Sequence, residues 1–158
     1  MPQLKKTMFR EYDLRGRESD DEMNEESVYY LGRGLGAFLK KRNLTETVVG
    51  HDARGTFEAF HKSLIKGLTE SGVNVVDIGT VTTPMSYWSQ YHLNIKGLVM
   101  ITASHNPAGW NGVKFGTDLS YTLLTDEMQE LYQIILNEEL VSGEGTIRKE
   151  DIRNAYIN

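Results

Sequence analysis

The stretch KGLVMITASHNPAGWNGVKF, residues 96–115, joins an apolar run to a polar loop, and the rest of the chain is organised around it. Its apolar part, residues 97–101, is short and bounded by turn signals, which predicts a buried strand. Ser104, His105 and Asn106 follow directly before a proline, where Asn-Pro and a nearby glycine favour a turn. A reactive hydroxyl in a tight loop at the end of a buried strand suits an active site.

Outward from this stretch, patterns typical of strands and helices alternate along the chain. Residues 113–115 are expected to be extended, and residues 7–16 mix apolar and charged side chains in a way that favours an edge strand. Thr83 and Pro84 are expected to be the N-cap and the first residue of a helix, and residues 142–147 resemble a linker. The other elements are strands at 47–50 and 73–78 and helices at 20–43, 57–71, 83–94 and from 124 onward.

Three glycines interrupt the first helical pattern with the spacing G-x-G-x-G, at Gly32, Gly34 and Gly36. A phosphate-binding loop would follow a strand, whereas these glycines follow none and lie inside the helical pattern. Close packing of this helix against a neighbour is therefore the preferred interpretation.

The alternation of strands and helices predicts an α/β domain with a mainly parallel (mixed) sheet sandwiched between helices. Right-handed crossovers bring the carboxyl ends of parallel strands to one edge, where such sheets bind ligands. Three exit loops, residues 51–56, 79–83 and 103–112, are expected to converge there. The loops and the following strand offer Arg54, Ser104, His105 and Lys114, a set that suits an anionic ligand such as a phosphate.

Length and composition limit the class of protein. The chain has 158 residues, which is the size of one domain, and a net charge of −5. No broad basic surface favours nucleic acid or an anionic membrane as a partner. There is no cysteine for a disulfide or thiolate metal site, and neither a membrane span nor a signal peptide is recognisable. A cytoplasmic protein is expected.

The context of Ser104 favours one kind of serine chemistry over another. A serine hydrolase would need a G-x-S-x-G turn with a helix directly behind it, which A-S-H-N-P does not provide. His105 is adjacent in sequence and points away from Ser104 in an extended segment, so it is a poor base for that hydroxyl. A serine that carries a phosphoryl group fits better. Taken alone, a Ser-His pair in a loop is more typical of a structural turn, and both interpretations remain open at this point.

Four motifs together resemble one enzyme family, the α-D-phosphohexomutases. The segment ITASHNPAGWNGVKF (residues 101–115) is similar to the family's serine loop, T-x-S-H-N-P followed by N-G-x-K. FREYDLRG (9–16) resembles the opening motif of the phosphomannomutase/phosphoglucomutase branch. VGHDAR (49–54) and GTVTTP (79–84) resemble V-G-x-D-x-R and G-x-x-x-T-P, and all four occur in family order.

The resemblance implies a mechanism and a fold, that of domain I of the family. Ser104 would be phosphorylated in the resting enzyme and would give its phosphoryl group to a hexose phosphate, forming a hexose bisphosphate. After the intermediate reorients, the other phosphoryl group would return to Ser104, so that the group moves between O1 and O6 of the sugar. Mg²⁺ would bridge the phosphorylated Ser104 and the aspartates of a D-G-D-G-D-R loop.

The same resemblance assigns roles to further residues. Lys114 would transfer a proton or stabilise the phosphoryl group, and Arg15 and Tyr12 would lie beside the phosphoserine and the sugar. His105 and Asn106 would shape the serine loop and contact substrate. Arg54, in contrast, is expected to have a structural role.

The chain departs from the family pattern in what it lacks. It contains no D-G-D-G-D-R segment, no sugar-recognising G-E-x-S-G segment and no C-terminal phosphate-binding loop. We therefore expect residues 1–147 to be domain I and residues 148–158 to begin the connection to a second domain. The remaining domains of the parent enzyme would be its partners, and this chain alone would be inactive.

Two alternatives stay open. The chain could be a stand-alone phosphosugar-binding or regulatory module that does not catalyse. It could also belong to a phosphoglucosamine mutase, although Tyr12 in the opening motif favours the glucose/mannose branch. The sequence does not decide between glucose and mannose.

Overall fold

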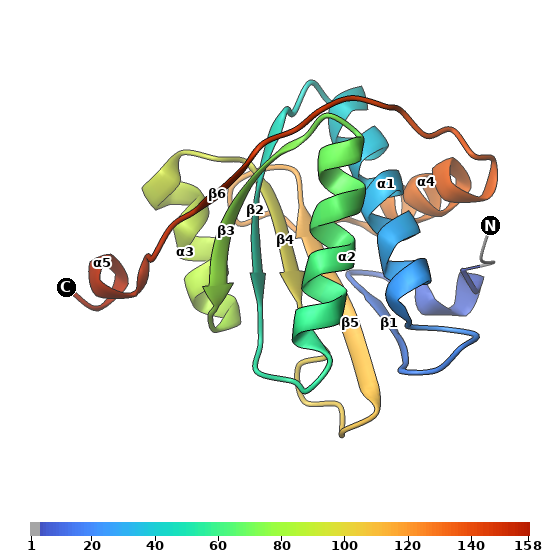
Figure 1. Ribbon diagram of the computed structural model, residues 1–158, viewed down its shortest axis with the longest axis horizontal. Helices are drawn as coiled ribbons and strands as arrows, with labels where there is room; N and C mark the ends of the chain where they lie inside the picture. Colours follow the sequence, from blue (N-terminus) through green and yellow to red (C-terminus); the bar gives the residue numbers. More distant parts are fainter. Residues whose placement is uncertain (1–3) are drawn as a thin grey trace.

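In a computed structural model, which describes residues 4–158, six strands form one sheet with helices on both faces (Figure 1). Along the chain the elements are η1 (Lys6–Met8), β1 (Leu14–Arg17), α1 (Glu25–Lys41), β2 (Glu46–His51), α2 (Phe57–Glu70), β3 (Asn74–Thr80), α3 (Thr83–Leu93), β4 (Gly97–Ile101), β5 (Trp110–Gly116), α4 (Thr125–Leu136), β6 (Ile147–Lys149) and α5 (Arg153–Ile157). No helix of the described residues is both long and apolar enough to cross a membrane.

The sheet is mixed, with the strand order β1-β5-β4-β2-β3-β6. Strand β2 runs parallel to β3 and β4, and β3 runs parallel to β6. Strand β5 is antiparallel to both of its neighbours, β1 and β4. The predicted α/β class with a mainly parallel, mixed sheet is therefore confirmed.

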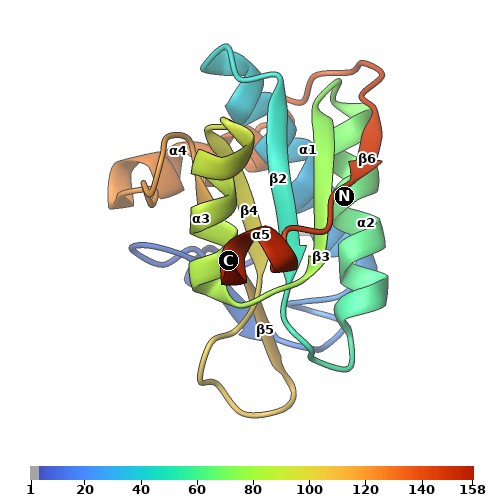
Figure 2. The same cartoon turned by 90° about the vertical axis from the view of Figure 1, so that its left-hand side faces the viewer.

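Alternation along the central strands builds a core on each face of the sheet, because successive side chains of a strand point to opposite faces. Val49 and Val99 pack with α1, α2 and α4, whereas their neighbours Val48 and Leu98 pack with α3. All four of these side chains are almost fully buried. Figures 1 and 2 show α1 and α2 on one side of the sheet and α3 on the other, so the predicted sandwich is confirmed.

The glycines of α1 allow its close approach to neighbouring segments, as the sequence indicated. A Cβ at Gly32 would lie 2.5 Å from the carbonyl oxygen of Leu64 on α2, and one at Gly34 would lie 2.3 Å from the Ile135 side chain on α4. The partner glycine on α2 is Gly67, where a Cβ would lie 2.3 Å from the carbonyl oxygen of Tyr29. The phosphate-loop interpretation of this segment is not needed.

Gly67→Ala is expected to lower the free energy of unfolding by about 1–3 kcal/mol, because the added methyl group meets backbone atoms of α1 that cannot rotate away. Gly55→Ala is the matched control, since a Cβ there has no atom within 4 Å. Chemical denaturation of both variants measures the difference. Equal stability of the two variants would contradict the close packing of α1 on α2.

The N-terminal boundaries differ from the sequence prediction. The helix expected from residue 20 begins at Glu25, because Asn24 and Ser27 cap it reciprocally: each backbone N–H donates to the other side chain at 2.9 Å. The edge strand expected over 7–16 is confined to β1, since the Arg10 N–H donates to the Asp13 carbonyl and closes a turn before it. β1 does lie at the sheet edge.

Two further boundaries move. Thr82, not Thr83, is the N-cap of α3, and Pro84 lies in its first turn. The segment 142–147 is not a free linker, because the Thr146 N–H and hydroxyl both donate to the Asn74 side chain, at 2.9 and 3.0 Å. It leads directly into β6. The domain boundary expected between residues 147 and 148 falls within this strand, and residues 1–3 of the expected domain lie outside the described residues.

Candidate active site

The loop of residues 102–109 projects from the edge of the sheet at which β2, β3 and β4 end (Figure 2). Ser104 lies in this loop with an exposed side chain and a left-handed backbone, with φ of +53°. Residues with a side chain adopt this conformation only when their surroundings hold them in it, and such positions concentrate at functional sites. Asn43, Asn94, Ser120 and Glu138 share this conformation, so it marks the Ser104 loop as a candidate site only together with the position of the loop at the sheet edge.

Arg15, which lies on β1, reaches the serine loop with its side chain. Its Nη2 lies 3.4 Å from the Ser104 hydroxyl oxygen, and its Nη1 donates to the Asn106 side-chain oxygen at 2.5 Å. The guanidinium is held from behind by Asp13, whose Oδ2 accepts from the Arg15 Nε at 2.9 Å. Arg15, Asn106 and Ser104, which the sequence singled out separately, are therefore neighbours.

Lys114 joins the same group through Asp13. Its Nζ lies 3.3 Å from Asp13 Oδ2, the oxygen that also accepts from Arg15. β1 and β5 are paired here, with Leu14 opposite Val113, which places both cations at one end of the sheet. Arg15 and Lys114 share the single carboxylate of Asp13, so these three side chains carry a net positive charge, and Arg15 lies beside the Ser104 hydroxyl. This charge suits a phosphoryl group.

Arg54 reaches the serine loop from the other side. It donates to the backbone carbonyls of Ser104 and Asn106 at 2.9 and 2.8 Å, and to those of Pro107 and Trp110, each at 3.2 Å. These contacts place the loops 51–56 and 102–109 side by side, as predicted from the parallel strands. The third exit loop joins them where the Val81 N–H donates to the His51 carbonyl at 3.0 Å.

The base of the loop is held by a buried asparagine. The Asn111 amide donates to the Thr56 hydroxyl at 2.9 Å and to Glu18 at 3.3 Å, and Thr56 donates to the same Glu18 oxygen at 2.5 Å. At Gly112 a Cβ would lie 2.3 Å from the Leu14 carbonyl oxygen, so the N-G pair lets β1 approach β5 closely. This network fixes the carboxyl-terminal end of the segment that carries Ser104.

Two of the predicted site residues stand apart from this cluster. Tyr12 and His105 are exposed, and within the described residues no hydrogen bond or ion pair joins either side chain to Ser104, Arg15 or Lys114. Their predicted contact with substrate stays a prediction.

Three residues of the site have roles that the sequence reasoning did not assign, namely Asp13, Asp52 and Thr102. Each lies inside a motif noted from the sequence: Asp13 in FREYDLRG, Asp52 in VGHDAR and Thr102 two residues before Ser104. Asp13 holds Arg15 and Lys114, and Asp52 accepts from Thr102 at 2.7 Å and from Arg54 at 3.2 Å. Their positions were visible in the sequence, but Lys114 lies 101 residues from Asp13 and Thr102 lies 50 residues from Asp52.

The side chains around Ser104 do not form a complete binding site for a divalent cation, and Ser104 itself could supply only one ligand. Among residues 4–158, no group of three or more His, Asp or Glu side chains could hold a metal ion. The nearby carboxylates are already engaged, Asp13 by two cations and Asp52 by Arg54 and Thr102. If Ser104 is phosphorylated, its phosphate would offer a single kind of ligand, and a divalent metal bound there would need further ligands from outside this site.

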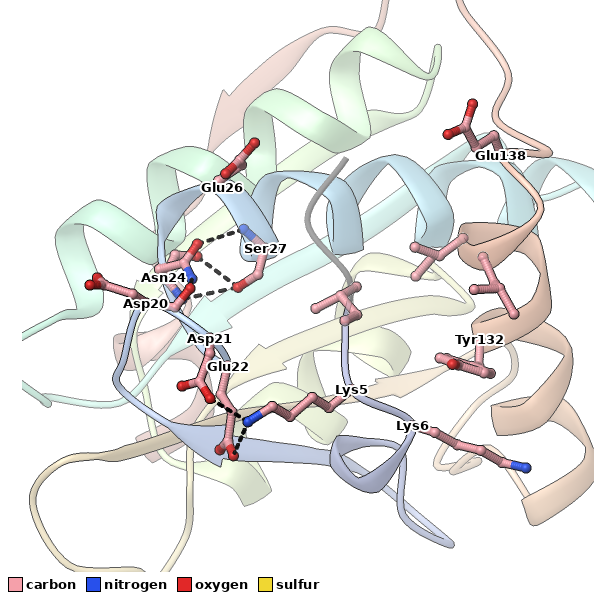
Figure 3. A pocket seen from close by; sticks show the side chains of 13 residues that line it. Lys5, Lys6, Asp20, Asp21, Glu22, Asn24, Glu26, Ser27, Tyr132 and Glu138 are labelled. Atoms are coloured by element: carbon pink, nitrogen blue, oxygen red, sulfur yellow. Dashed lines mark hydrogen bonds and ion pairs between the residues drawn. The ribbon is translucent and has the colours of Figure 1, made fainter.

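Away from the serine loop, a pocket of ≈ 760 Å³ lies between the N-terminal segment, the start of α1 and α4 (Figure 3). Several of its polar residues are paired with one another. Lys5 contacts Asp21 and Glu22, and Asn24 bonds to Ser27. None of the residues that the sequence singled out for chemistry lines it, so the serine loop remains the candidate site.

The chain is similar to known proteins along nearly its whole length. Residues 6–142 match the family model described as phosphoglucomutase/phosphomannomutase, alpha/beta/alpha domain I. A phosphomannomutase/phosphoglucomutase of Pseudomonas syringae pv. tomato is 37% identical over 156 residues, which are 99% of this chain and 33% of that protein. A phosphomannomutase of Klebsiella pneumoniae is 34% identical over 157 residues, covering 96% of this chain and 98% of that protein.

A solved structure agrees in fold. The crystal structure of a phosphoglucomutase/phosphomannomutase family protein from Burkholderia thailandensis matches with a TM-score of 0.90 at 26% identity, over 98% of this chain and 35% of that one. The chain thus spans about a third of the length of the Pseudomonas and Burkholderia proteins.

Proposed function

This chain belongs to the phosphoglucomutase/phosphomannomutase family as its domain I, and on that premise we propose that Ser104 carries the phosphoryl group of a hexose phosphate mutase. The observation that carries the proposal is the exposed Ser104 hydroxyl, held in a left-handed turn 3.4 Å from Arg15 Nη2. Lys114 adds a second cation through Asp13. This combination of a fixed hydroxyl and unbalanced positive charge is what transfer of a phosphoryl group requires.

The proposed reaction has two transfers. A hydroxyl oxygen of the hexose phosphate attacks the phosphorus of phosphorylated Ser104; the new P–O bond forms as the P–Oγ bond breaks, and the bonding electron pair stays on Oγ. The sugar hydroxyl loses one proton and Oγ ends as a hydroxyl, so one proton moves between them, with Lys114 as the proposed relay. The hexose bisphosphate then reorients, and the reverse transfer from its other phosphate restores the phosphoserine.

The residues of this chain have defined tasks in these steps. Arg15 is placed to neutralise charge on the phosphoryl group at Ser104, and Asn106 fixes the Arg15 guanidinium. Phosphorylated Ser104 would offer one ligand to Mg²⁺, which would supply further neutralisation of the transferring group when bound. Tyr12 and His105 are exposed and are proposed to contact the sugar.

The substrates that we propose are hexose 1- and 6-phosphates, because relatives with 34–37% identity are named phosphomannomutase or phosphomannomutase/phosphoglucomutase. Glucose and mannose are both included. A second candidate, a stand-alone phosphosugar-binding module, is favoured by one observation: the Klebsiella relative is matched over 98% of its length.

The test is an assay of the complete encoded protein, including any domains that follow residue 158, with glucose 1-phosphate and mannose 1-phosphate, Mg²⁺ and hexose bisphosphate. Formation of the 6-phosphates, with a phosphoryl group on Ser104 by mass spectrometry, is the expected result. An open reading frame that ends at residue 158, with saturable binding of hexose phosphate and no turnover, would favour the stand-alone module.

Lys114→Ala is expected to lower kcat of the encoded protein by about 10²-fold, since one stabilising donor near transferring charge is typically worth that much. Lys96→Ala is the matched control, because Lys96 also pairs with an aspartate, Asp118 at 3.2 Å, on another part of the surface. Steady-state kinetics and thermal unfolding are measured together. If the two variants lose rate and stability equally, Lys114 is a structural residue only.

A further inference from the structure

We propose that Arg54, Asp52 and Thr102 form a clamp that fixes the left-handed backbone of Ser104 and so aims its hydroxyl at Arg15. In this proposal Arg54 is a positioning residue, and it touches neither substrate nor phosphoryl group. The catalytic consequence rests on the function proposed above, whereas the structural claim stands without it.

Both backbone polar atoms of Ser104 are held by this clamp. The Ser104 N–H donates to the Thr102 hydroxyl at 2.9 Å, and the Ser104 carbonyl accepts from Arg54 Nη2 at 2.9 Å. The two branches meet at one atom, Asp52 Oδ2, which accepts from the Thr102 hydroxyl at 2.7 Å and from Arg54 Nε at 3.2 Å. The hydrogen bonds therefore close a ring around the one residue of the loop whose conformation is strained.

All of the N–H donors of Arg54 form hydrogen bonds within the protein. A guanidinium has five N–H groups, and here Nε donates to Asp52, Nη1 donates to the carbonyls of Pro107 and Trp110, and Nη2 donates to those of Ser104 and Asn106. No N–H remains for an anionic ligand. The sequence-based choice between a phosphate-binding and a structural Arg54 is thereby answered in favour of structure.

The other bonds to the loop are also polar: Arg15 donates to the Asn106 side chain, and the N–H groups of Asn106 and Glu18 donate to the carbonyls of Ala103 and Gly109. His105, Pro107, Ala108 and Gly109 are exposed, so apolar burial contributes little to its shape. Positioning by hydrogen bonds is then the main constraint on the Ser104 hydroxyl. A shift of about 1 Å in a reacting group can cost about 10²-fold in rate, so loss of the clamp should appear in turnover.

The test compares Arg54→Lys with Arg33→Lys in the complete encoded protein. A lysine keeps the charge but cannot span four carbonyls, because it lacks the planar fork. Arg33 is a matched control: its side chain is 16% exposed against 17% for Arg54, and it too donates to a backbone carbonyl, that of Val141 at 2.8 Å. It lies outside the serine loop.

For Arg54→Lys we expect kcat to fall about 10- to 100-fold while KM changes less than about threefold, because positioning acts on the transition state and not on substrate binding. Amide hydrogen exchange of residues 103–109 should rise at least about tenfold, since the loop opens more often. Arg33→Lys should leave the turnover and the exchange of residues 103–109 within about twofold of the parent protein, because the Arg33 side chain bonds to Val141, Ser142 and Ser71 and not to the serine loop.

A second pair of variants tests the other branch without changing a charge. Thr102→Val removes the hydroxyl that accepts from the Ser104 N–H, so hydrogen exchange of the Ser104 amide should rise and kcat should fall. Thr102→Ser keeps the hydroxyl, so both the exchange rate and kcat should return to the values of the parent protein. A rise in KM at unchanged kcat in Arg54→Lys would overturn the proposal, as would unchanged loop exchange in both Arg54→Lys and Thr102→Val. If the parent protein turns over no hexose phosphate, the proposed function fails, and the exchange data alone decide on the clamp.

Discussion

Ser104→Ala is expected to reduce mutase turnover of the encoded protein by at least about 10³-fold, because removal of a group that forms a covalent intermediate abolishes the main route. Alanine has no oxygen that could accept or return a phosphoryl group, while Arg15, Asp13 and Lys114 remain in place. The effect should appear in kcat, and the mass of the protein should no longer include a phosphoryl group at this position.

The matched control is Ser120→Ala. Ser120 is also exposed and also left-handed, with φ of +51°, but it lies in the loop between β5 and α4. Both variants replace a serine at the same kind of strained position, so they should change stability by similar amounts. Turnover of Ser104→Ala close to that of Ser120→Ala would mean that Ser104 is not the phosphoryl carrier.

The 158-residue chain on its own is expected to unfold cooperatively and to turn over no hexose phosphate. It has a hydrophobic core on each face of its sheet, which is sufficient for independent folding. However, the described residues offer no cluster of carboxylates for a divalent metal, and the two carboxylates near Ser104 are bound to cations and a hydroxyl. Neutralisation of the transferring group would be incomplete.

This expectation is measured with the purified chain, by denaturant unfolding and by conversion of glucose 1-phosphate and mannose 1-phosphate with Mg²⁺ and hexose bisphosphate. The complete encoded protein is the positive control, and the Ser104→Ala form of the chain is the negative control. Sustained turnover that follows the chain through purification and disappears in the negative control would show that its own residues build the metal and sugar sites.

The repeating pattern of the sequence determined the fold class. Apolar runs such as residues 97–101 and the helical spacing of α1, α2 and α4 reflect burial, which acts residue by residue and is visible in a single chain. Element boundaries were less predictable. The start of α1 depends on reciprocal hydrogen bonds between Asn24 and Ser27. Strand β6 depends on pairing with β3, which lies far away along the chain, next to the hydrogen bonds from Thr146 to Asn74.

For the candidate site too, some features could be predicted from the sequence and others were shown only by the tertiary structure. The sequence by itself predicted Ser104 and Lys114 from their residue types and their place after a buried strand, and the resemblance of its motifs to the phosphohexomutases added Arg15 and Asn106. Only the tertiary structure showed that Asp13 joins Arg15 to Lys114, and that all five donors of Arg54 are used within the protein. The physical reason is that a hydrogen bond requires two groups within about 3 Å in a fixed direction, and which groups meet that condition is decided when strands and loops from distant parts of the chain are brought to one edge of the sheet.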